Sequence, residues 1–474
     1  MTDNGAGKQL QRIGWVAAAS LVVSNMVGSG IFTTSGFLLQ NLRSPWLLLV
    51  IWAVGGALAV AGTLCYAELG ASLPQVGGDY IYLRKAYGPL WAFFTGWMAF
   101  FAGIGAPIGL AALTCMEYLS TFVPVLTVQG HEPLIGIWGL TITVSAGQVA
   151  AAGLIWLLTG VHWLGIRTGG RWQSAITMLN VGLIAGFILA ALIAGGGDWS
   201  NLNRLVPPES SASGSTGAMF AISLIWVMFA YSGFNAAAYV AGEIDNPSRN
   251  LPRGLITGVV TVTVMYLGLN LVYILAAEPG ELAGKLDVAR VAAAGLFGRR
   301  AEMLVSVVIV TCAIAATSAM ICVGPRIYSQ MARDGVFFAA AARIHPQRGT
   351  PGGALLLQAI WASTLIFFGS FDQLLTFTGF LLSLFSALSV ASVIVLRRRF
   401  PDLPRPYKAW GYPVTPLLYV AVSLWMMVWS LFSRPGESLI GLGIVGAGLP
   451  VYYFWRRRSG AAPSTGEPTD TAPP

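Results

Sequence analysis

The sequence predicts an all-α polytopic membrane protein with about twelve transmembrane helices. Hydrophobic residues make up 55% of the 474 positions and charged residues only 10%, whereas a soluble domain carries about 25% charged residues. The mean hydropathy is +0.70. Apolar stretches of about 20 residues, long enough to cross a bilayer, recur along the chain. The length therefore divides into membrane spans instead of soluble domains.

The expected spans follow one another with short polar connections. The first is the most distinct, because no charged residue lies between Arg12 and Arg43. It is also too long for the apolar core of a cleavable signal peptide. A polar tail is expected at residues 1–12, and a disordered cytoplasmic tail rich in Pro, Ser and Thr at 456–474. The twelve spans are expected at residues 13–39, 46–67, 89–123, 139–160, 173–195, 217–241, 254–277, 302–330, 353–371, 373–396, 413–433 and 436–455.

The placement of the basic residues explains the net charge of +8 without any binding to nucleic acid. If the N-terminus is cytoplasmic, all but seven of the 27 Lys and Arg residues fall in cytoplasmic loops or in the tails. This asymmetry is the positive-inside pattern of a multi-pass protein. We therefore expect both termini in the cytoplasm and the chain in the plasma membrane. The seven exceptions are Arg43, Arg204, Lys285, Arg290, Arg299, Arg300 and Arg434.

Neither an enzyme nor a metal or cofactor site is expected. The three histidines, His131, His162 and His345, are expected in loops and cannot assemble a metal cluster. No HExxH motif is present, no Asp falls within an expected span, and no span offers a His as the base of a serine hydrolase. A channel stays open as an alternative, although the chain has no carbonyl-ring filter motif.

The first and sixth spans each contain a glycine interruption. Residues 24–32 read SNMVGSGIF, and residues 229–237 read FAYSGFNAA. The two spans are five apart, so two five-span units sharing this feature would insert in opposite orientations, as in transporters with inverted repeats. The alternative, a purely structural one, is that these glycines only permit close helix packing. The expected divisions are a transmembrane domain at 13–455, repeats at 13–195 and 217–396, and two further helices at 413–455.

An interrupted membrane helix exposes backbone groups that a ligand can use. Unsatisfied N–H and C=O groups cost several kcal/mol each in hydrocarbon, so such backbone is tolerated where it lines a cavity or meets a ligand. The half-helix after Gly28 directs N–H groups and a partial positive charge at the break, which suits a carboxylate. Unwound carbonyls of the sixth span, with those just before the first break, suit an ammonium group. Together these groups fit an α-amino acid.

Three charged residues lie at or near the ends of the expected spans. Glu68, Glu117 and Arg326 are functional candidates, because charges within a membrane are rare. Their position near the span ends favours structural or gating roles.

Five stretches of the sequence carry a family resemblance. They are VGSGIF (27–32), YAELGASLPQVGGDYIYL (66–83), FAYSGFNAAAYVAGEIDNPSRNLPRG (229–254), GPRIYSQMARDG (324–335) and RRRFPDLPRPYKAWGYP (397–413). In these stretches the chain resembles the amino acid–polyamine–organocation superfamily, and within it the bacterial relatives of the L-type amino acid transporters. The resemblance implies a secondary active permease or exchanger that works by alternating access. It also implies a five-plus-five inverted repeat with broken helices 1 and 6.

The resemblance implies a substrate site at the two breaks. Gly28 would permit the first break, and the N–H groups of Ser29 and Gly30 would hold the carboxylate. The carbonyl groups for the substrate's ammonium would come from Met26, Phe229 and Ser232.

The same resemblance gives the sixth span a gate and a side-chain pocket. Phe229 matches an aromatic gate, unless it is an ordinary core residue. Gly233 marks the second break, and Asn235 would brace the unwound backbone or bind a polar side chain. Small residues and the lack of an obvious acid favour neutral amino acids, with cationic amino acids or polyamines as the alternative. The expected pocket residues are Ala230, Phe234, Ser318 and Ala319.

Two departures from the family pattern bear on coupling and partners. Many bacterial members carry a lysine in the fifth span, where this chain has Asn180, and a neutral amide cannot load and release a proton. We therefore hypothesise that lysine-based proton coupling is absent, which leaves exchange, uniport, or sodium near Asn180 and the hydroxyls of Thr317 and Ser318. Animal members bond a heavy chain through an external cysteine. No such partner is expected here, because the loop between the third and fourth expected spans has no cysteine. All four cysteines fall inside expected spans: Cys65, Cys115, Cys312 and Cys322.

Overall fold

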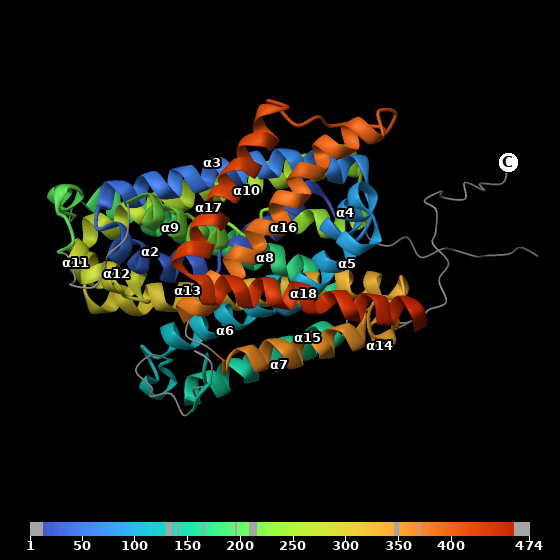
Figure 1. Ribbon diagram of the computed structural model, residues 1–474. Helices are drawn as coiled ribbons and strands as arrows, with labels where there is room; N and C mark the ends of the chain where they lie inside the picture. The colour runs from blue at the N-terminus through green and yellow to red at the C-terminus, as the bar shows by residue number, and fades with distance from the viewer. Residues whose placement is uncertain are drawn as a thin grey trace, which may run out of the picture.

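The computed structural model arranges the chain as a bundle of helices (Figure 1). It describes residues 13–128, 135–137, 140–142, 144–164, 166–194, 197–207, 216–345, 350–368 and 371–458. The expected N-terminal tail at 1–12 lies outside the described residues, as does the C-terminal tail from residue 459 onward. The helical fold class predicted from composition is confirmed.

The first half of the bundle contains the first five spans. The first span is divided into two helices, and the third is continuous through one π-helical turn. The elements are α1 (Trp15–Met26), α2 (Ser29–Leu42), α3 (Pro45–Ser72), α4 (Asp79–Tyr87), α5 (Pro89–Met98), η1 (Ala99–Gly103), α6 (Gly105–Leu119), η2 (Pro124–Leu126), β1 (Ile135–Ile137), β2 (Leu140–Ile142), α7 (Ala146–Leu164) and α8 (Ile166–Ala194).

The second half begins after a short 3₁₀ turn, η3 (Trp199–Asn203). Its first span is again divided, and short helices connect several of the long ones. The elements are α9 (Thr216–Ala230), η4 (Ala236–Glu243), α10 (Pro247–Ala276), α11 (Pro279–Leu282), α12 (Val288–Phe297), α13 (Arg299–Arg333), α14 (Ala339–Ala342), α15 (Gly352–Leu365), α16 (Phe371–Arg399), α17 (Val414–Ser433) and α18 (Pro435–Arg458).

Ten helical segments among the described residues are long and apolar enough to cross a membrane. They match ten of the twelve expected spans. The other two, the sixth and the ninth, match shorter apolar helices at Gly217–Ala230 and Gly352–Leu365. The sixth is short because the helix is interrupted after Ala230, and the chain continues in η4 as a 3₁₀ helix.

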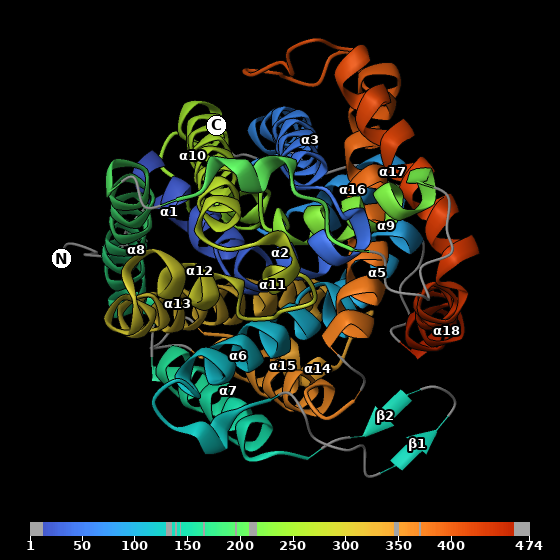
Figure 2. The ribbon, with the colours of Figure 1, turned by 90° about the vertical axis from the view of Figure 1, so that its left-hand side faces the viewer.

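The predicted start of the fourth span is wrong. Strands β1 and β2 form a small antiparallel hairpin, in which Ile135 pairs with Ile142, and α7 begins only at Ala146. Residues 141–144, which read Thr-Ile-Thr-Val, are all β-branched, and such a run favours a strand over a helix. The hairpin stands out from the edge of the bundle (Figure 2). At its other end α7 runs to Leu164, so His162 lies within a helix and not in a loop as predicted.

Corresponding spans of the two halves pack against each other. α3 packs along α10, and α6 packs along α13, which pairs the second span with the seventh and the third with the eighth. Viewed along the bundle, α2 lies near the middle, and α7, α8 and α18 lie at the rim (Figure 2). The rim helices expose large apolar side chains, among them Leu164 and Ile193. Lipid contact is the natural environment for such a surface.

The charged residues near the span ends form pairs. Glu68 accepts two hydrogen bonds from Arg397, at 2.8 and 2.6 Å, which tie the end of α3 to the end of α16. Arg326 donates two to Glu243, at 2.8 and 3.0 Å, and joins α13 to η4. Glu117 accepts from the backbone of the loop after α6. These contacts give Glu68, Glu117 and Arg326 structural duties at the ends of the bundle.

Candidate substrate site

The first interruption lies between α1 and α2. α1 ends at Met26, and Gly28 leaves the helical conformation with φ −138° and ψ −142° before α2 begins at Ser29. The N–H of Gly28 turns back to the carbonyl of Met26 at 2.9 Å. The first N–H groups of α2 have no preceding helical turn to bond. They therefore carry the positive end of the helix dipole into the break.

The second interruption follows α9. Gly233 has φ +95°, in the left-handed region that favours glycine. Ser232 donates its N–H to the carbonyl of Phe229 at 2.9 Å, and Ala236 donates to that of Gly233 at 2.9 Å. The backbone thus makes two tight turns before η4 begins, and the α-helical hydrogen-bond ladder is broken at the level of Gly233.

The two interruptions pack directly on each other through glycine. A methyl group on Gly30 would lie 2.5 Å from both Cα and Cβ of Ala230, and one on Gly233 would lie 2.8 Å from Cβ of Asn25. Each break thus meets the opposite span at a position where a side chain would collide. The packing interpretation of the glycines is confirmed at Gly30 and Gly233, because these glycines allow the two interrupted segments to touch.

Tyr266 of α10 links the ends of α1 and α9. Its hydroxyl lies 2.6 Å from the carbonyl oxygen of Met26 and 3.0 Å from that of Ala230. The ring is buried and packs edge-on against Trp52 at 5.2 Å. The hydroxyl has one proton to share between these two carbonyls, and it bridges the end of α1 to the end of α9. Nothing in the regular apolar sequence of α10 marks which tyrosine faces the breaks, so sequence reasoning missed Tyr266.

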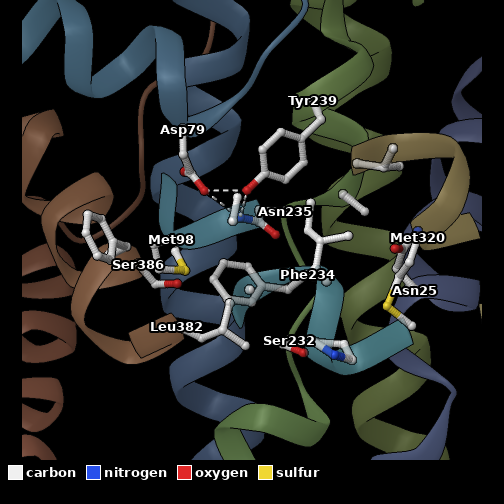
Figure 3. Close-up of a pocket in the computed structure, with 18 of the residues that line it drawn as sticks. Asn25, Asp79, Met98, Ser232, Phe234, Asn235, Tyr239, Met320, Leu382 and Ser386 are labelled. Carbon is white, nitrogen blue, oxygen red and sulfur yellow. Dashed lines mark hydrogen bonds between the residues drawn. The ribbon is translucent and has the colours of Figure 1, made fainter. Parts of the chain in front are cut away.

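A cavity opens beside the second interruption and extends to α4 (Figure 3). Its wall combines α1, the middle of the third span, the α9–η4 segment, α13, α16 and α17. Apolar side chains such as Met98, Met320 and Leu382 form much of the lining. Among the described residues, the lining contains no Lys or Arg. A largely apolar pocket with a few polar groups is the usual form of a small-molecule site.

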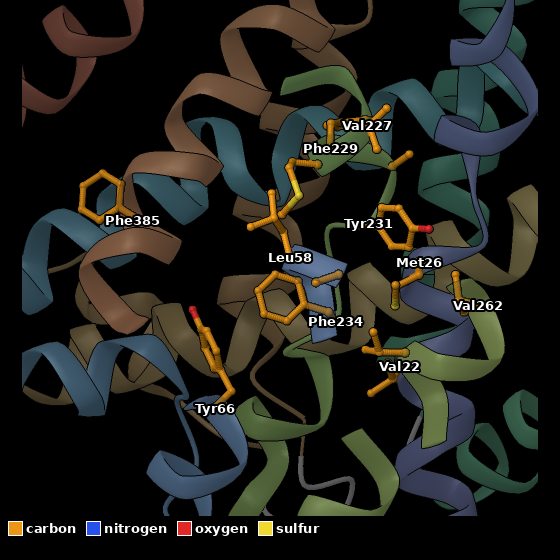
Figure 4. Packing of buried hydrophobic residues seen from close by; sticks show 14 of the residues in the cluster. Val22, Met26, Leu58, Tyr66, Val227, Phe229, Tyr231, Phe234, Val262 and Phe385 are labelled. Atoms are coloured by element: carbon orange, nitrogen blue, oxygen red, sulfur yellow. The ribbon is translucent and has the colours of Figure 1, made fainter. Parts of the chain in front are cut away.

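Three of the predicted site residues line this cavity: Ser232, Gly233 and Phe234. The ring of Phe234 packs edge-on against Tyr66, with 5.3 Å between ring centroids (Figure 4). Phe229, the expected gate, lies buried in the core instead of in the cavity lining. The other predicted residues outside the lining are Met26, Gly28, Ser29, Gly30, Ala230, Ser318 and Ala319.

On α13, Ser318 contacts α7, whereas Met320 and Val323 face the cavity. The hydroxyl of Ser318 lies 2.9 Å from Nε2 of His162 on α7, and Ala319 is buried. Met320 and Val323 are the residues through which α13 lines the cavity. The cavity therefore meets α13 at Met320 and Val323, and not at Ser318 and Ala319, the residues predicted to border the side-chain pocket.

Asp79 is an acidic residue of the cavity that sequence reasoning missed. Gly77 (φ +130°) and Gly78 (φ +52°) turn the chain just before it. A methyl group on Gly78 would lie 2.4 Å from the ring of Tyr239, so this glycine lets the loop rest on that ring. The Gly-Gly-Asp sequence after the second span was the available signal, but only the fold brings it to the cavity.

Asn180 lies in a second, small pocket against the first interruption. Val23, Ser24 and Val27 line this pocket together with Asn180. The amide oxygen of Asn180 accepts a hydrogen bond from Thr311 at 3.0 Å. The hydroxyl of Thr317 donates instead to the carbonyl of Ala313. Thr317 and Ser318, the other residues of the expected sodium site, do not line this pocket.

A bundle of membrane-crossing helices with two interrupted helices in corresponding positions, and a cavity between them, defines a secondary transporter. A family model described as amino acid permease matches residues 13–449, and the chain belongs to this family. It is a multi-pass membrane protein that transports amino acids by secondary active transport, and it is not an enzyme.

Curated relatives cover nearly the whole chain. The large neutral amino acids transporter small subunit 2 of Homo sapiens is 32% identical over 465 residues, which are 96% of this chain and 83% of the relative. The Asc-type amino acid transporter 1 of Mus musculus is 28% identical, over 94% and 82% of the two chains. The serine/threonine exchanger SteT of Bacillus subtilis (strain 168) is 28% identical, over 96% and 98%.

Proposed function

We propose that this protein exchanges neutral amino acids across the plasma membrane, with the substrate bound where the two interrupted helices meet. The mutual packing of the interruptions at Gly30 and Gly233 is the observation that carries the proposal. It puts backbone donors and acceptors from both repeats around one point. The names of the human and bacterial relatives, a neutral amino acid transporter and an exchanger, support the substrate class and the exchange mode.

Backbone groups hold the fixed part of the substrate. The carboxylate binds at the start of α2, to the N–H groups of Ser29 and Gly30, where the helix dipole favours an anion. The ammonium group binds carbonyls at the ends of α1 and α9, of which that of Met26 is shared with Tyr266 in this conformation. The cavity reaches Ser232 but not Gly30, so full engagement requires the two interruptions to move apart slightly.

The lining favours an uncharged substrate side chain. It is largely apolar, and the carboxylate of Asp79 already accepts hydrogen bonds from Tyr239 and Asn235. A lysine or arginine substrate would have to break these bonds to reach that carboxylate. The alternative substrates, cationic amino acids or polyamines, are therefore disfavoured.

The orientation and subunit composition follow from the charges and the cysteines. The basic loops and both tails lie in the cytoplasm, as the positive-inside pattern requires. The human relative is named as a small subunit, but all four cysteines of this chain lie within helices, three of them buried. A disulfide-linked heavy subunit is therefore not required.

Proton coupling of transport does not depend on a lysine in the fifth span, because this chain has Asn180 there.

Counterflow in proteoliposomes tests the proposal. Vesicles loaded with unlabelled leucine are compared with empty vesicles for uptake of labelled leucine, and a panel of neutral and cationic amino acids then replaces the internal leucine. We expect loaded vesicles to take up roughly tenfold more label than empty ones, with neutral amino acids as effective partners. Equal uptake by loaded and empty vesicles would contradict exchange, and partners limited to lysine and arginine would contradict the substrate class.

A further inference from the structure

One oxygen of the Asp79 carboxylate has no hydrogen-bond partner. Oδ2 accepts from the hydroxyl of Tyr239 at 2.5 Å and from the amide of Asn235 at 3.2 Å (Figure 3). Oδ1 is buried, and no described residue donates a hydrogen bond to it. The hydroxyls of Tyr66 on α3 and Ser389 on α16 approach the same carboxylate, and both are likewise buried without a partner. Among the described residues, these three buried oxygen atoms therefore lie near one another without a hydrogen bond of ordinary length and angle between them.

No cation among the described residues compensates this carboxylate. Among the described residues, no Lys, Arg or His forms an ion pair with Asp79. Arg84, from the same helix, pairs with Asp334 at 2.7 Å. A buried carboxylate without a cation is costly, and such a group usually takes up a proton instead. The titratable groups that surround Asp79 are the tyrosines of four elements: Tyr66 (α3), Tyr82 (α4), Tyr239 (η4) and Tyr419 (α17).

The balance of effects favours the neutral acid. Burial is the largest and raises the pKa of Asp79 above its ordinary value, while the hydroxyls of Tyr239, Tyr66 and Ser389 favour the charged form and lower the pKa. Burial prevails in this conformation. The opposing contacts favour release of the proton when the carboxyl group gains access to water.

We propose that Asp79 is a proton-binding site and that amino-acid exchange requires its proton, an inference that rests on the transport function proposed above. The proton occupies Oδ1, because Oδ2 already accepts two hydrogen bonds. The neutral acid can then donate toward the hydroxyl of Ser389 or Tyr66. When Asp79 loses this proton, the proton passes to water in the cavity and the carboxylate keeps an uncompensated negative charge.

The position of this site connects it to the second interruption. Asn235 immediately precedes η4, and Tyr239 lies within it. Both are bonded to Asp79, so a change of charge on the carboxylate alters the restraint on the half-helix that follows Gly233. Protonation thereby controls how readily that half-helix moves during the transport cycle.

Larger cations suit the position less well. Oδ1 is buried, so the ammonium or guanidinium group of a cationic substrate cannot reach it without displacing the surrounding side chains. A sodium ion would need several oxygen ligands, and Tyr66 and Ser389 are the described residues that offer theirs near Oδ1. A proton needs neither space nor further ligands.

The test compares the pH profile of leucine exchange in wild-type protein with that of Asp79→Asn. Asparagine resembles the neutral acid, since it can accept at one atom and donate at the other. Exchange is measured in proteoliposomes with equal pH on both sides, from about pH 5 to about pH 9. Wild-type exchange should fall by about tenfold per pH unit above the pKa of Asp79, as expected for one required proton. The Asp79→Asn variant should remain active and vary by less than about twofold.

Asp334→Asn is the matched control, because this carboxylate contacts the same helix, α4, but is paired with Arg84. It should keep the wild-type pH profile. A flat wild-type profile would overturn the proton site even if Asp79→Asn failed to fold, and so would an Asp79→Asn profile equal to that of wild type. Exchange that requires sodium in the wild type but not in the variant would assign the site to sodium and also overturn the proposal. Absence of leucine exchange in the wild type at every pH would instead count against the transport function.

Discussion

Gly30 and Gly233 occupy the points at which the two interrupted helices touch. At Gly233 the backbone conformation itself demands glycine, with φ +95°. At Gly30 the demand is steric, because Ala230 lies directly over the position that a side chain would take. The sequence predicts both positions, since each lies in a Ser-Gly pair within an apolar span. It does not predict Asp79, whose approach to the cavity depends on two glycines with positive φ and on the ring of Tyr239 from a distant span.

Gly30→Ala should abolish exchange while the protein still inserts and folds. The added methyl group would collide with backbone and side-chain carbons of Ala230 at 2.5 Å, and overpacking of this kind costs about 1–3 kcal/mol. The methyl group would also crowd the N–H of Gly30 that is proposed to bind the carboxylate, so we expect a loss of more than about tenfold in the exchange rate. Gly182→Ala in α8 is the control, because no atom of the described residues lies within 4 Å of its added methyl group. An active Gly30→Ala protein would show that close contact between the breaks is dispensable.

At the scale of single elements, α10 holds the interrupted helices in place through Tyr266. The periodic apolar pattern predicts α10 as a helix, but the particular tyrosine that meets the breaks follows only from how α10 packs on α1 and α3. The predicted start of the fourth span failed for a local reason, since a β-branched run forms β2 where a helix was expected. The second half of the sixth span also differs from the predicted α-helix, because it forms the 3₁₀ helix η4.

Tyr266→Phe should destabilise the protein and slow exchange. Removing the hydroxyl leaves the carbonyls of Met26 and Ala230 without this buried donor, which costs about 1–3 kcal/mol. Thermal unfolding in detergent should show a lower Tm. Tyr273→Phe on the same helix is the control, because the buried hydroxyl of Tyr273 has no hydrogen-bond partner among the described residues. Equal Tm values for the two variants would refute the role given to Tyr266.

At the scale of the whole molecule, the two halves are held together at the ends of the bundle as well as at its centre. Composition and charge placement predict the membrane class and the number of spans to within two. Which charged groups pair could not be predicted, because Glu68 and Arg397 are far apart in the sequence. Their contact joins α3 to α16 and also receives the backbone N–H of Ala409 at 2.7 Å.

Glu68→Gln should lower the Tm strongly. Glu68 is 3% exposed, and breaking a buried pair by removing one charge costs about 3–5 kcal/mol. Arg434→Gln is the control, since it removes a partly exposed pair with Glu437 that contributes about 0–1 kcal/mol. The double variant Glu68→Gln with Arg397→Gln should recover part of the loss. A double variant no more stable than Glu68→Gln would show that pairing of the charges is not what Glu68 contributes.

The central claim is that backbone groups at the two interruptions bind both charged ends of an amino acid, and competition by leucine analogues tests it most directly. Inhibition of labelled leucine uptake is compared for leucine, leucinol, which lacks the carboxylate, and 4-methylpentanoate, which lacks the ammonium. Hydrogen bonds to charged groups contribute about 1.5–3 kcal/mol each. We therefore expect each analogue to inhibit at least about tenfold more weakly than leucine. Inhibition by either analogue at the same concentration as leucine would contradict recognition of the zwitterion at this site.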